Sequence, residues 1–542
     1  MKVLPAASFS LLLLMIGCRG GDEAAERAIA ALVPADAAVF VRLLSIDDLV
    51  DTARTGATPF GVPTELIGAD PMLATIGPMG GDTTYVDKKR PIAFALVAPR
   101  AVQPIPLVFV PVTDAAKYVA SLQGSGIQTF VDGGYVVLPL SGKYEKPAQP
   151  SALATNLPAE LVVARVDVAK AAQNLGTVIG AGFLAFKTMV SQAETGNAGV
   201  DGAAVADLYI EAAKALLASG QSFELAADAP NGKLAVSARM QMKPGSDLDG
   251  WGSAPVDLAP FAGKLSPRSA ANVVMVADWK ALWPRFESML EPLFDIYPQQ
   301  GRTAMREMMR GYRELYEAMG PVLAADVDVD AKGLGMTAHM TPTAAESMFS
   351  LFATMTQSSQ LATFGVAFTP GETGEVDGAR FQDHRLRVDF LKFASAISAV
   401  PVPESERGKA EDAIARMLGK DGLQMRLAAK GGSAAIGVGH RAADTVAALG
   451  RSGGSWPTSM RAAMAAVGDC NPMFVECIDF LAMFRGMQEW IPEMVPPGFP
   501  QFSAGTSADF VIAAGIRGAE WRGHFEMDLV GFGEAVRASS RR

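Results

Sequence analysis

Two landmarks recur along the chain at one common offset. The tetrapeptide Leu-Ala-Ala-Asp at residues 225–228 returns at residues 323–326. A Met-x-Pro motif follows each copy at the same distance, at residues 242–244 and 340–342. Two landmarks that recur with the same spacing are less easily explained by chance than a single repeated tetrapeptide would be. The period, roughly a hundred residues, exceeds the 20 to 50 residues of stacked solenoid repeats, so it predicts duplicated domain-sized modules.

The sequence around both copies predicts a strand, a helical segment and a hairpin. Pro158 and Pro267 each lead an apolar strand, and helical sequence follows each strand. A turn is predicted at residues 230–232, where Asn-Gly favours a tight reversal, and a second one near residues 330–333. A third, weaker copy occupies residues 472–527, and the strand at residues 37–43 can start a fourth.

The helical segments carry apolar residues on one side. In residues 302–320, Met and aromatic side chains recur every three to four positions, with arginines on the other faces. Antiparallel hairpins covered by such helices predict an α+β fold. The most apolar stretch after residue 18, residues 176–190, is interrupted by Lys187 and predicts a buried or amphipathic helix.

The first residues have the layout of an export signal. Lys2 supplies a positive charge, and residues 8–17 are uncharged and mostly apolar. This run is shorter than the roughly 20 residues that a membrane-spanning helix needs. A charged start, an apolar middle and small residues at the end are typical of a secretory signal.

The end of this segment, Met15-Ile16-Gly17-Cys18, resembles the lipobox of bacterial lipoproteins. The resemblance implies cleavage after Gly17, diacylglycerol on Cys18 and acylation of the new amino group. Met15 departs from the more usual leucine. Position 19 is Arg and not Asp, which favours the outer membrane over the inner membrane, with the body facing the periplasm. The module pattern is also similar to that of large uncharacterised envelope lipoproteins, from which no activity follows.

These features predict the organisation of the chain. We expect a signal peptide at residues 1–17, and a lipidated cysteine with a tether or short helix at residues 18–31. Three lobes are expected to follow, an N-terminal lobe at residues 32–250, a middle lobe carrying the repeat copy at residues 251–360, and a C-terminal lobe at residues 361–542.

The composition excludes several classes of protein. Hydrophobic residues make up 49% and charged residues 19%, which suits packed cores and argues against disorder. The net charge of -10 is spread along the chain, which argues against nucleic-acid binding, since that needs a clustered basic face. It also argues against electrostatic attraction to anionic lipid.

Three short motifs resemble catalytic or metal sites but lack the surrounding sequence that such sites require. Residues 450–454 match G-x-S-x-G, but the preceding segment is helical and not a strand, so a loop is predicted. The alternating aspartates of residues 326–330 lack the Gly and Glu of a calcium loop, so they predict a strand with one acidic solvent face. Asp383, His384 and Asp389 predict a surface cluster and not an acid–base pair.

Metal ligands and thiols are sparse. None of the four histidines stands in a zinc-type spacing, so no metal or cofactor is expected. Met305, Met308 and Met309 predict core filling, with an adaptable apolar surface or a copper site as alternatives. Cys470 and Cys477 are a possible disulfide, since an exported protein permits one. A strand between them would instead hold them about 23 Å apart at ~3.3 Å per residue.

The sequence therefore predicts a lipid-anchored envelope protein with a non-enzymatic binding or structural role and no catalytic residue. The expected partners are the membrane, through lipid on Cys18, and an envelope protein or an apolar ligand. A scaffold predicts a surface patch. A carrier of lipid or another apolar ligand predicts a cavity lined by Met, Phe and Leu. An unrecognised enzyme predicts a cleft with converging titratable groups.

Overall fold

The computed structural model describes residues 23–69, 81–98, 103–123, 126–193, 202–246, 256–294, 299–342, 345–356, 365–389, 421–492 and 505–540, with short pieces between them. The chain divides into two compact units. Unit 1 contains residues 1–180, 216–249 and 519–542, and unit 2 contains residues 181–215 and 250–518. Each unit therefore combines segments that lie far apart in the sequence.

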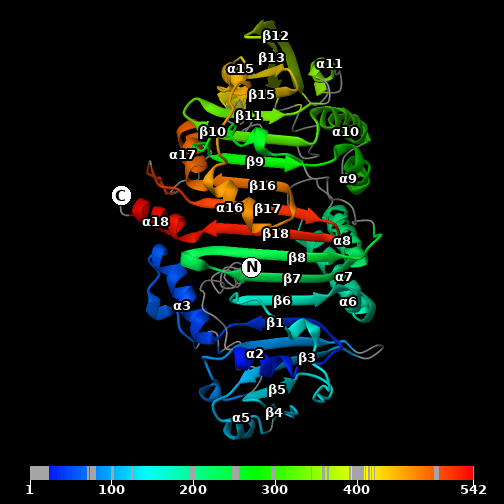
Figure 1. The fold of residues 1–542 in the computed structure, drawn as a ribbon, viewed down its shortest axis with the longest axis vertical. Helices are drawn as coiled ribbons and strands as arrows, with labels where there is room; N and C mark the ends of the chain where they lie inside the picture. Colours follow the sequence, from blue (N-terminus) through cyan, green and yellow to red (C-terminus); the bar gives the residue numbers. More distant parts are fainter. Residues whose placement is uncertain are drawn as a thin grey trace. The chain divides into compact units, whose positions relative to one another are not determined.

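Unit 1 is an open antiparallel sheet (Figure 1). Helices cover both of its faces, because residues 25 and 29 belong to one core cluster and residues 46, 50 and 118 to another, on alternate strand positions. Its described strands are β1 (Ala37–Leu43), β2 (Ile92–Val97), β3 (Ile105–Pro111), β4 (Phe130–Asp132), β5 (Tyr135–Pro139), β6 (Val162–Asp167), β7 (Gly220–Asp228), β8 (Lys233–Met242) and β18 (Glu520–Asp528). Its helices are α2 (Glu23–Ala30), α3 (Ile46–Ala57), α5 (Ala115–Ser121), α6 (Val168–Asn174) and α18 (Leu529–Ser540), with short 3-10 turns η1 (Thr58–Phe60), η2 (Thr64–Leu66), η4 (Thr83–Tyr85), η5 (Ala152–Ala154) and η6 (Pro230–Gly232). Paired strands follow the order β4, β5, β3, β2, β1, β6, β7, β8, β18.

Unit 2 is also an open antiparallel sheet. Its described strands are β9 (Ala271–Val276), β10 (Val322–Asp330), β11 (Gly333–Met340), β12 (Val366–Val376), β13 (Ala379–Val388), β14 (Leu423–Lys430), β15 (Ser433–Gly439), β16 (Asn471–Asp479) and β17 (Asp509–Arg517). Its helices are α9 (Trp279–Phe294), α10 (Gln299–Met319), α11 (Ala345–Thr356), α15 (Thr445–Leu449), α16 (Thr458–Ala466) and α17 (Phe480–Trp490), with the turns η7 (Ala259–Phe261) and η8 (Ala442–Asp444). Helices α7 (Gly176–Ala193) and α8 (Gly202–Ser219) fall largely in this unit. Paired strands follow the order β17, β16, β9, β10, β11, β15, β14, β13, β12.

The strand–helix–hairpin module and the α+β fold predicted from the repeat are confirmed. The two Leu-Ala-Ala-Asp copies lie in β7 and β10, each the second strand of its module. In every module the first strand pairs antiparallel with the second, as β1 with β2, β6 with β7, β9 with β10 and β16 with β17. Asn231 and Gly232 have φ values of 55° and 77°, the left-handed backbone that a tight reversal needs.

The modules join in pairs through their first strands. In unit 1, β1 pairs antiparallel with β6, and in unit 2, β9 pairs antiparallel with β16. Each unit therefore contains two modules whose first strands pair with each other. In each module, the connection that contains the helices follows this first strand. The third strand of the last module, β18, belongs to unit 1, where it pairs with β8.

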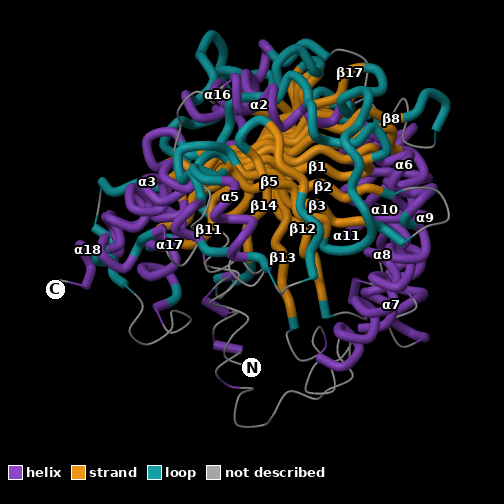
Figure 2. Tube along the Cα trace, turned by 90° about the horizontal axis from the view of Figure 1, so that it is seen from below, coloured by secondary structure: helices purple, strands orange, loops and turns teal. Residues whose placement is uncertain are grey.

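Both faces of the unit 2 sheet are covered. Figure 2 shows α16 on one face, and α10 and α17 on the other. Val274, Ala324 and Val475 pack beneath α16, whereas Ala325, Ala338 and Leu427 form a second core with α10 and α11. This alternation follows from the two-residue period of a strand.

The residue ranges of the two compact units differ from those of the predicted lobes. A boundary near residue 250 is common to both, but unit 1 also takes in residues 519–542, because β18 pairs along its length with β8. The sequence predicted either a tether or a short helix for residues 18–31, and residues 23–30 form helix α2. Ala25 and Ile29 of α2 are fully buried in the unit 1 core.

Candidate functional site

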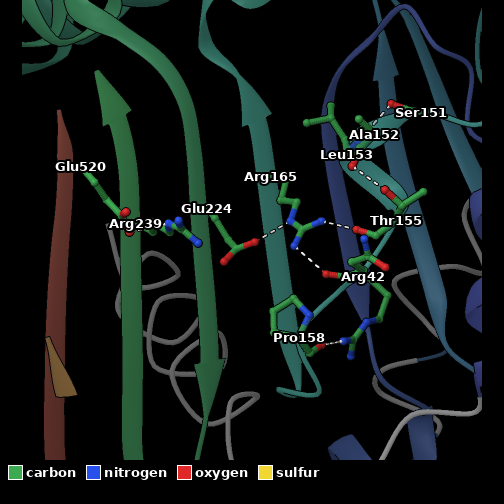
Figure 3. Close-up of polar contacts among 11 residues, drawn as sticks. Arg42, Ser151, Ala152, Leu153, Thr155, Pro158, Arg165, Glu224, Arg239 and Glu520 are labelled. Atoms are coloured by element: carbon green, nitrogen blue, oxygen red, sulfur yellow. Dashed lines mark hydrogen bonds and ion pairs between the residues drawn. The ribbon is translucent and has the colours of Figure 1, made fainter. Parts of the chain in front are cut away.

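Charged side chains form a row across the polar face of four unit 1 strands (Figure 3). The strand register places Arg165 of β6 opposite Glu224 of β7, and Glu224 opposite Arg239 of β8. Arg239 in turn lies opposite Arg522 of β18. Directly opposite residues of antiparallel strands share one face, so the register alone assembles this row.

Glutamates separate the arginines of this row. Arg165 Nε lies 2.5 Å from Oε2 of Glu224, and its other two nitrogens donate to the carbonyl oxygens of Thr155 at 2.6 Å and Asn156 at 2.9 Å. Glu520 Oε1 lies 2.6 Å from Nε of Arg239 and 2.7 Å from Nε of Arg522.

Partial burial by itself would raise the pKa of Glu520. The hydrogen bond and charge of Arg522, together with the charge of Arg239, outweigh burial and lower this pKa. The glutamate is therefore held as a carboxylate, which suits an ion-pair ladder and not a general acid.

Arg42 of β1 is a second anchor in unit 1. Its side chain is fully buried, and it donates to the carbonyl oxygens of Glu160 at 2.6 Å and of Pro158. A guanidinium nitrogen lies 3.5 Å from the carboxylate of Glu26 in α2. Burial lowers the pKa of Arg42, and Glu26 opposes this shift. These contacts tie α2 and the loop before β6 to the sheet.

In unit 2 the alternating aspartates of β10 meet an arginine. The predicted acidic solvent face is wrong, because the side chain of Asp326 is fully buried. Asp326 Oδ2 accepts from Arg441 at 2.6 Å and from Ser269 Oγ at 2.9 Å, and Arg441 also pairs with Asp328. The predicted alternation is correct, but the aspartates face a covering segment and not water.

Other polar groups are buried beside this pair. Strand register places Asn272 and Thr337 on either side of Asp326, and His339 two residues further along β11 on the same face. Burial lowers the pKa of His339 to about 3, with smaller contributions from Lys264 and Arg451. Asn272 Oδ1, Asp326 Oδ1 and both ring nitrogens of His339 have no hydrogen-bond partner among the described residues.

A half-open pocket of about 570 Å³ lies in unit 1. Val97 of β2 and Ile105 and Leu107 of β3 supply apolar lining, and residues 143–149 supply Lys143, Glu145, Lys146 and Tyr144. Tyr144 is fixed by donating its hydroxyl to the carbonyl oxygen of Leu32 at 2.7 Å. The lining is mixed, and it differs from the Met, Phe and Leu cavity expected of a carrier.

Helices α7 and α8 expose large apolar side chains. Residues 176–190 were predicted as a buried or amphipathic helix, and the helix is confirmed as part of α7. Of the two predicted alternatives, a buried helix is wrong, because Val178, Leu184 and Met189 are 54%, 68% and 57% exposed. On α8, Tyr209 is 61% and Leu216 is 40% exposed. Large exposed apolar groups can mark an interaction surface, so α7 and α8 are a candidate binding site.

The remaining site predictions have mixed outcomes. Cys18 lies outside the described residues. The predicted possible disulfide is absent, since Cys470 and Cys477 are both buried and not joined to each other. Cys477 lies within β16, while Cys470 precedes that strand, so an extended chain separates the two thiols.

Asp383 and His384 are not the predicted surface cluster. Both are buried, and as neighbours on β13 they point to opposite faces. Asp383 binds Arg426 through two contacts of 2.6 and 2.7 Å, whereas His384 lies against Phe352. The G-x-S-x-G motif lies in the predicted loop, between α15 and α16.

Arg42 and Arg441 were not among the residues predicted from the sequence. A signal for Arg42 was its place among apolar residues in a strand. Nothing in the sequence around Arg441 links it to Asp326, which lies 115 residues earlier. Within the part of the chain that is described, no group of three metal-ligating side chains occurs. No described helix is both long enough and apolar enough to cross a membrane.

Comparisons with known proteins find no matching family and only weak structural similarity. No protein-family model matches the chain, and no curated protein matches it. Among solved structures, crystal form III of TP0453 matches with a TM-score of 0.22 and 8% identity, over 53% of this chain and all of that one. Crystal form IV of TP0453 matches with a TM-score of 0.22 and 8% identity, over 54% and 98% of the two chains.

Proposed function

We propose that this chain is a lipid-anchored protein of the bacterial envelope that acts by binding and not by catalysis. The observation that carries the proposal is the exposed apolar surface of α7 and α8, which includes Leu184, Met189 and Tyr209. Taking such a side chain from full exposure to full burial is favourable by about 1.5–3 kcal/mol, and these three are 57–68% exposed, so a partner that covers them gains part of that free energy from each. Lipid on Cys18, with the body facing the periplasm at the outer membrane, completes the proposal.

The charged groups support a structural and not a catalytic assignment. Glu520 is held between Arg239 and Arg522, and Asp326 is held by Arg441 and Ser269. A general acid or base must reach the proton that it transfers, whereas these carboxylates are already occupied by cations of the same unit.

A second candidate function is the carriage of a small apolar ligand. The pocket of about 570 Å³ favours it, because this volume is in the range of small-molecule sites, roughly 300–1,000 Å³. Its apolar lining from β2 and β3 would hold the ligand, and Lys143 would hold a polar end.

The anchor is tested by expressing the full chain in a two-membrane bacterium as wild type and as Cys18→Ser. We expect acyl mass on the wild type and an unlipidated, uncleaved precursor for the variant. Cys470→Ser is the matched control and should keep the acyl mass. A wild-type protein that is soluble in the periplasm without acyl mass would refute the anchor.

The binding role is tested by native mass spectrometry of protein extracted from its own membranes. A stoichiometric second protein or a retained lipid supports binding. A lipid that is lost on Ile105→Trp, which fills the pocket, selects the carrier. A reproducible turnover that is abolished by one pocket substitution would overturn the non-enzymatic proposal.

A further inference from the structure

Helix α7 combines an apolar composition with exposure. Its 18 residues contain one charged side chain, Lys187. An amphipathic helix normally hides its apolar stripe, and a helix that is apolar all round is normally buried in a core or in lipid. α7 instead leaves Val178, Leu184 and Met189 more than half exposed.

These side chains point to more than one side of α7. At about 100° per residue, Val178 and Met189 lie about 20° apart around the helix axis, and Leu184 lies about 120–140° from both. A folded protein partner covers one face of a helix. A fluid lipid layer adapts its shape around a helix that sinks into it and can contact side chains in both directions.

The lone charge of α7 is neutralised within the same unit. Lys187 Nζ lies 2.7 and 2.6 Å from the two carboxylate oxygens of Asp207 on α8. In water an exposed pair of this kind contributes little to stability. In the apolar part of a bilayer the pairing matters more, because an unpaired charge there is costly.

Helix α8 has a matching distribution. Tyr209 and Leu216 lie about 20° apart around its axis, and Glu211 and Lys214 lie about 140–160° away from Tyr209. Glu211 and Lys214 pair with each other at 2.7 Å. Tyrosine is enriched at membrane–water boundaries, where its ring is buried and its hydroxyl stays hydrated.

The chain also starts close to the bilayer that the anchor would provide. Four residues, 19–22, separate Cys18 from the start of α2 at Glu23, so the two Cα atoms are five residue steps apart. Fully extended, these steps span at most about 17 Å. A body held this near a membrane meets its surface at a high effective concentration.

From these observations we infer that α7 and α8 enter the interfacial layer of a lipid bilayer, as a contact separate from the lipid on Cys18. The inference rests on the proposed function and names its partner. Apolar side chains of α7 and Tyr209 and Leu216 of α8 bury into the headgroup and acyl boundary, where such helices reach about 5–10 Å deep. Because the contact is apolar, it needs no anionic headgroup.

The test uses the full-length protein in phosphatidylcholine vesicles. Leu184→Cys and Met189→Cys are each labelled with an environment-sensitive fluorophore, and Val376→Cys of β12 is the matched control. Val376 is also a large exposed apolar residue of unit 2, at 47%. Unsubstituted protein treated in the same way gives the background from Cys470 and Cys477, which are buried, and from Cys18 wherever it is not acylated. Far-UV circular dichroism checks the fold of each variant.

We expect a blue-shifted emission and at least a twofold quenching by lipid-borne nitroxide at positions 184 and 189, with neither change at position 376. Water-like emission at 184 and 189 in vesicles would overturn the inference. So would a shift that needs a second protein and occurs without vesicles, which would assign the surface to a protein partner.

The mass of the same samples separates this inference from the proposed anchor. Acylated Cys18 with no shift at position 184 refutes the bilayer contact and leaves the anchor in place. Unacylated protein that shows the shift when vesicles are added refutes the anchor and leaves the bilayer contact in place.

Discussion

Arg441 places a guanidinium nitrogen 2.6 Å from Oδ2 of Asp326, a fully buried carboxylate that stands 115 residues earlier in the chain. The same guanidinium pairs with Asp328. One arginine, two residues after the end of β15, therefore compensates two aspartates of β10 and fixes the segment that follows β15 over the sheet.

Replacing Arg441 should destabilise unit 2 strongly. Arg441→Met leaves Asp326 buried without its cation, and loss of one partner of a buried pair lowers the free energy of unfolding by about 3–5 kcal/mol. Lys214→Met removes an exposed pair with Glu211 and should change it by less than about 1 kcal/mol. Urea unfolding measures both.

Adding Asp326→Asn to Arg441→Met should recover part of the loss, because the unpaired charge is gone. Equal unfolding midpoints for wild type and Arg441→Met would show that the pair contributes nothing.

Stability should fall in acid because of His339. Its pKa is lowered to about 3 by burial, while the unfolded chain has the ordinary value of 6.5. The unfolded state therefore binds the extra proton between these values. The resulting stability is complete above about pH 6.5 and is lost as the pH falls toward 3, by at most about 1.4 kcal/mol per pH unit.

His339→Gln removes this proton and should flatten the dependence by up to that slope. Urea unfolding of both proteins at pH 7 and pH 5 measures the difference. Parallel slopes for the two proteins would contradict the assignment.

Replacing Arg42 should lower the free energy of unfolding more than replacing Arg239, although both are arginines in strands of unit 1. Arg42→Met removes the donors to the carbonyl oxygens of Pro158 and Glu160 in a fully buried setting, which we expect to cost about 2–4 kcal/mol. Arg239→Met removes a pair in which the arginine is more than half exposed, and should cost less than about 1 kcal/mol. Hydrogen exchange in α2 should become faster only in Arg42→Met. Unchanged exchange in α2 would show that Arg42 does not hold this helix to the sheet.

Two glycine substitutions should act in opposite directions. In α17, a β-carbon at Gly486 would overlap the carbonyl oxygen of Val329 in β10, so Gly486→Ala must push the helix from the sheet and lower the melting temperature. In α7, a β-carbon at Gly182 would meet nothing within 4 Å. Gly182→Ala should therefore stabilise its helix by about 0.5–1 kcal/mol. Calorimetry of both variants tests this, and a neutral Gly486→Ala would exclude close packing of α17.

Much of the fold could be predicted from local patterns. The repeat at residues 225–228 and 323–326 predicted the module, because each copy lies in the second strand of the same arrangement. The pairing of β1 with β6 and of β9 with β16 could not be predicted, since no local pattern records which strand lies next to which. The candidate site was predicted less well. The apolar composition of α7 predicted its helix, but whether anything covers a helix depends on the rest of the chain.

The sequence by itself determined the strands, the helices, their repeated order and the alternation of Asp326 and Asp328 on one side of β10, because these depend on residue spacing and backbone preference. Only the tertiary structure decided that Asp326 is buried and Leu184 exposed. Burial depends on which distant segments pack against a side chain, as Arg441 does against Asp326, and spacing along the chain carries no record of that contact.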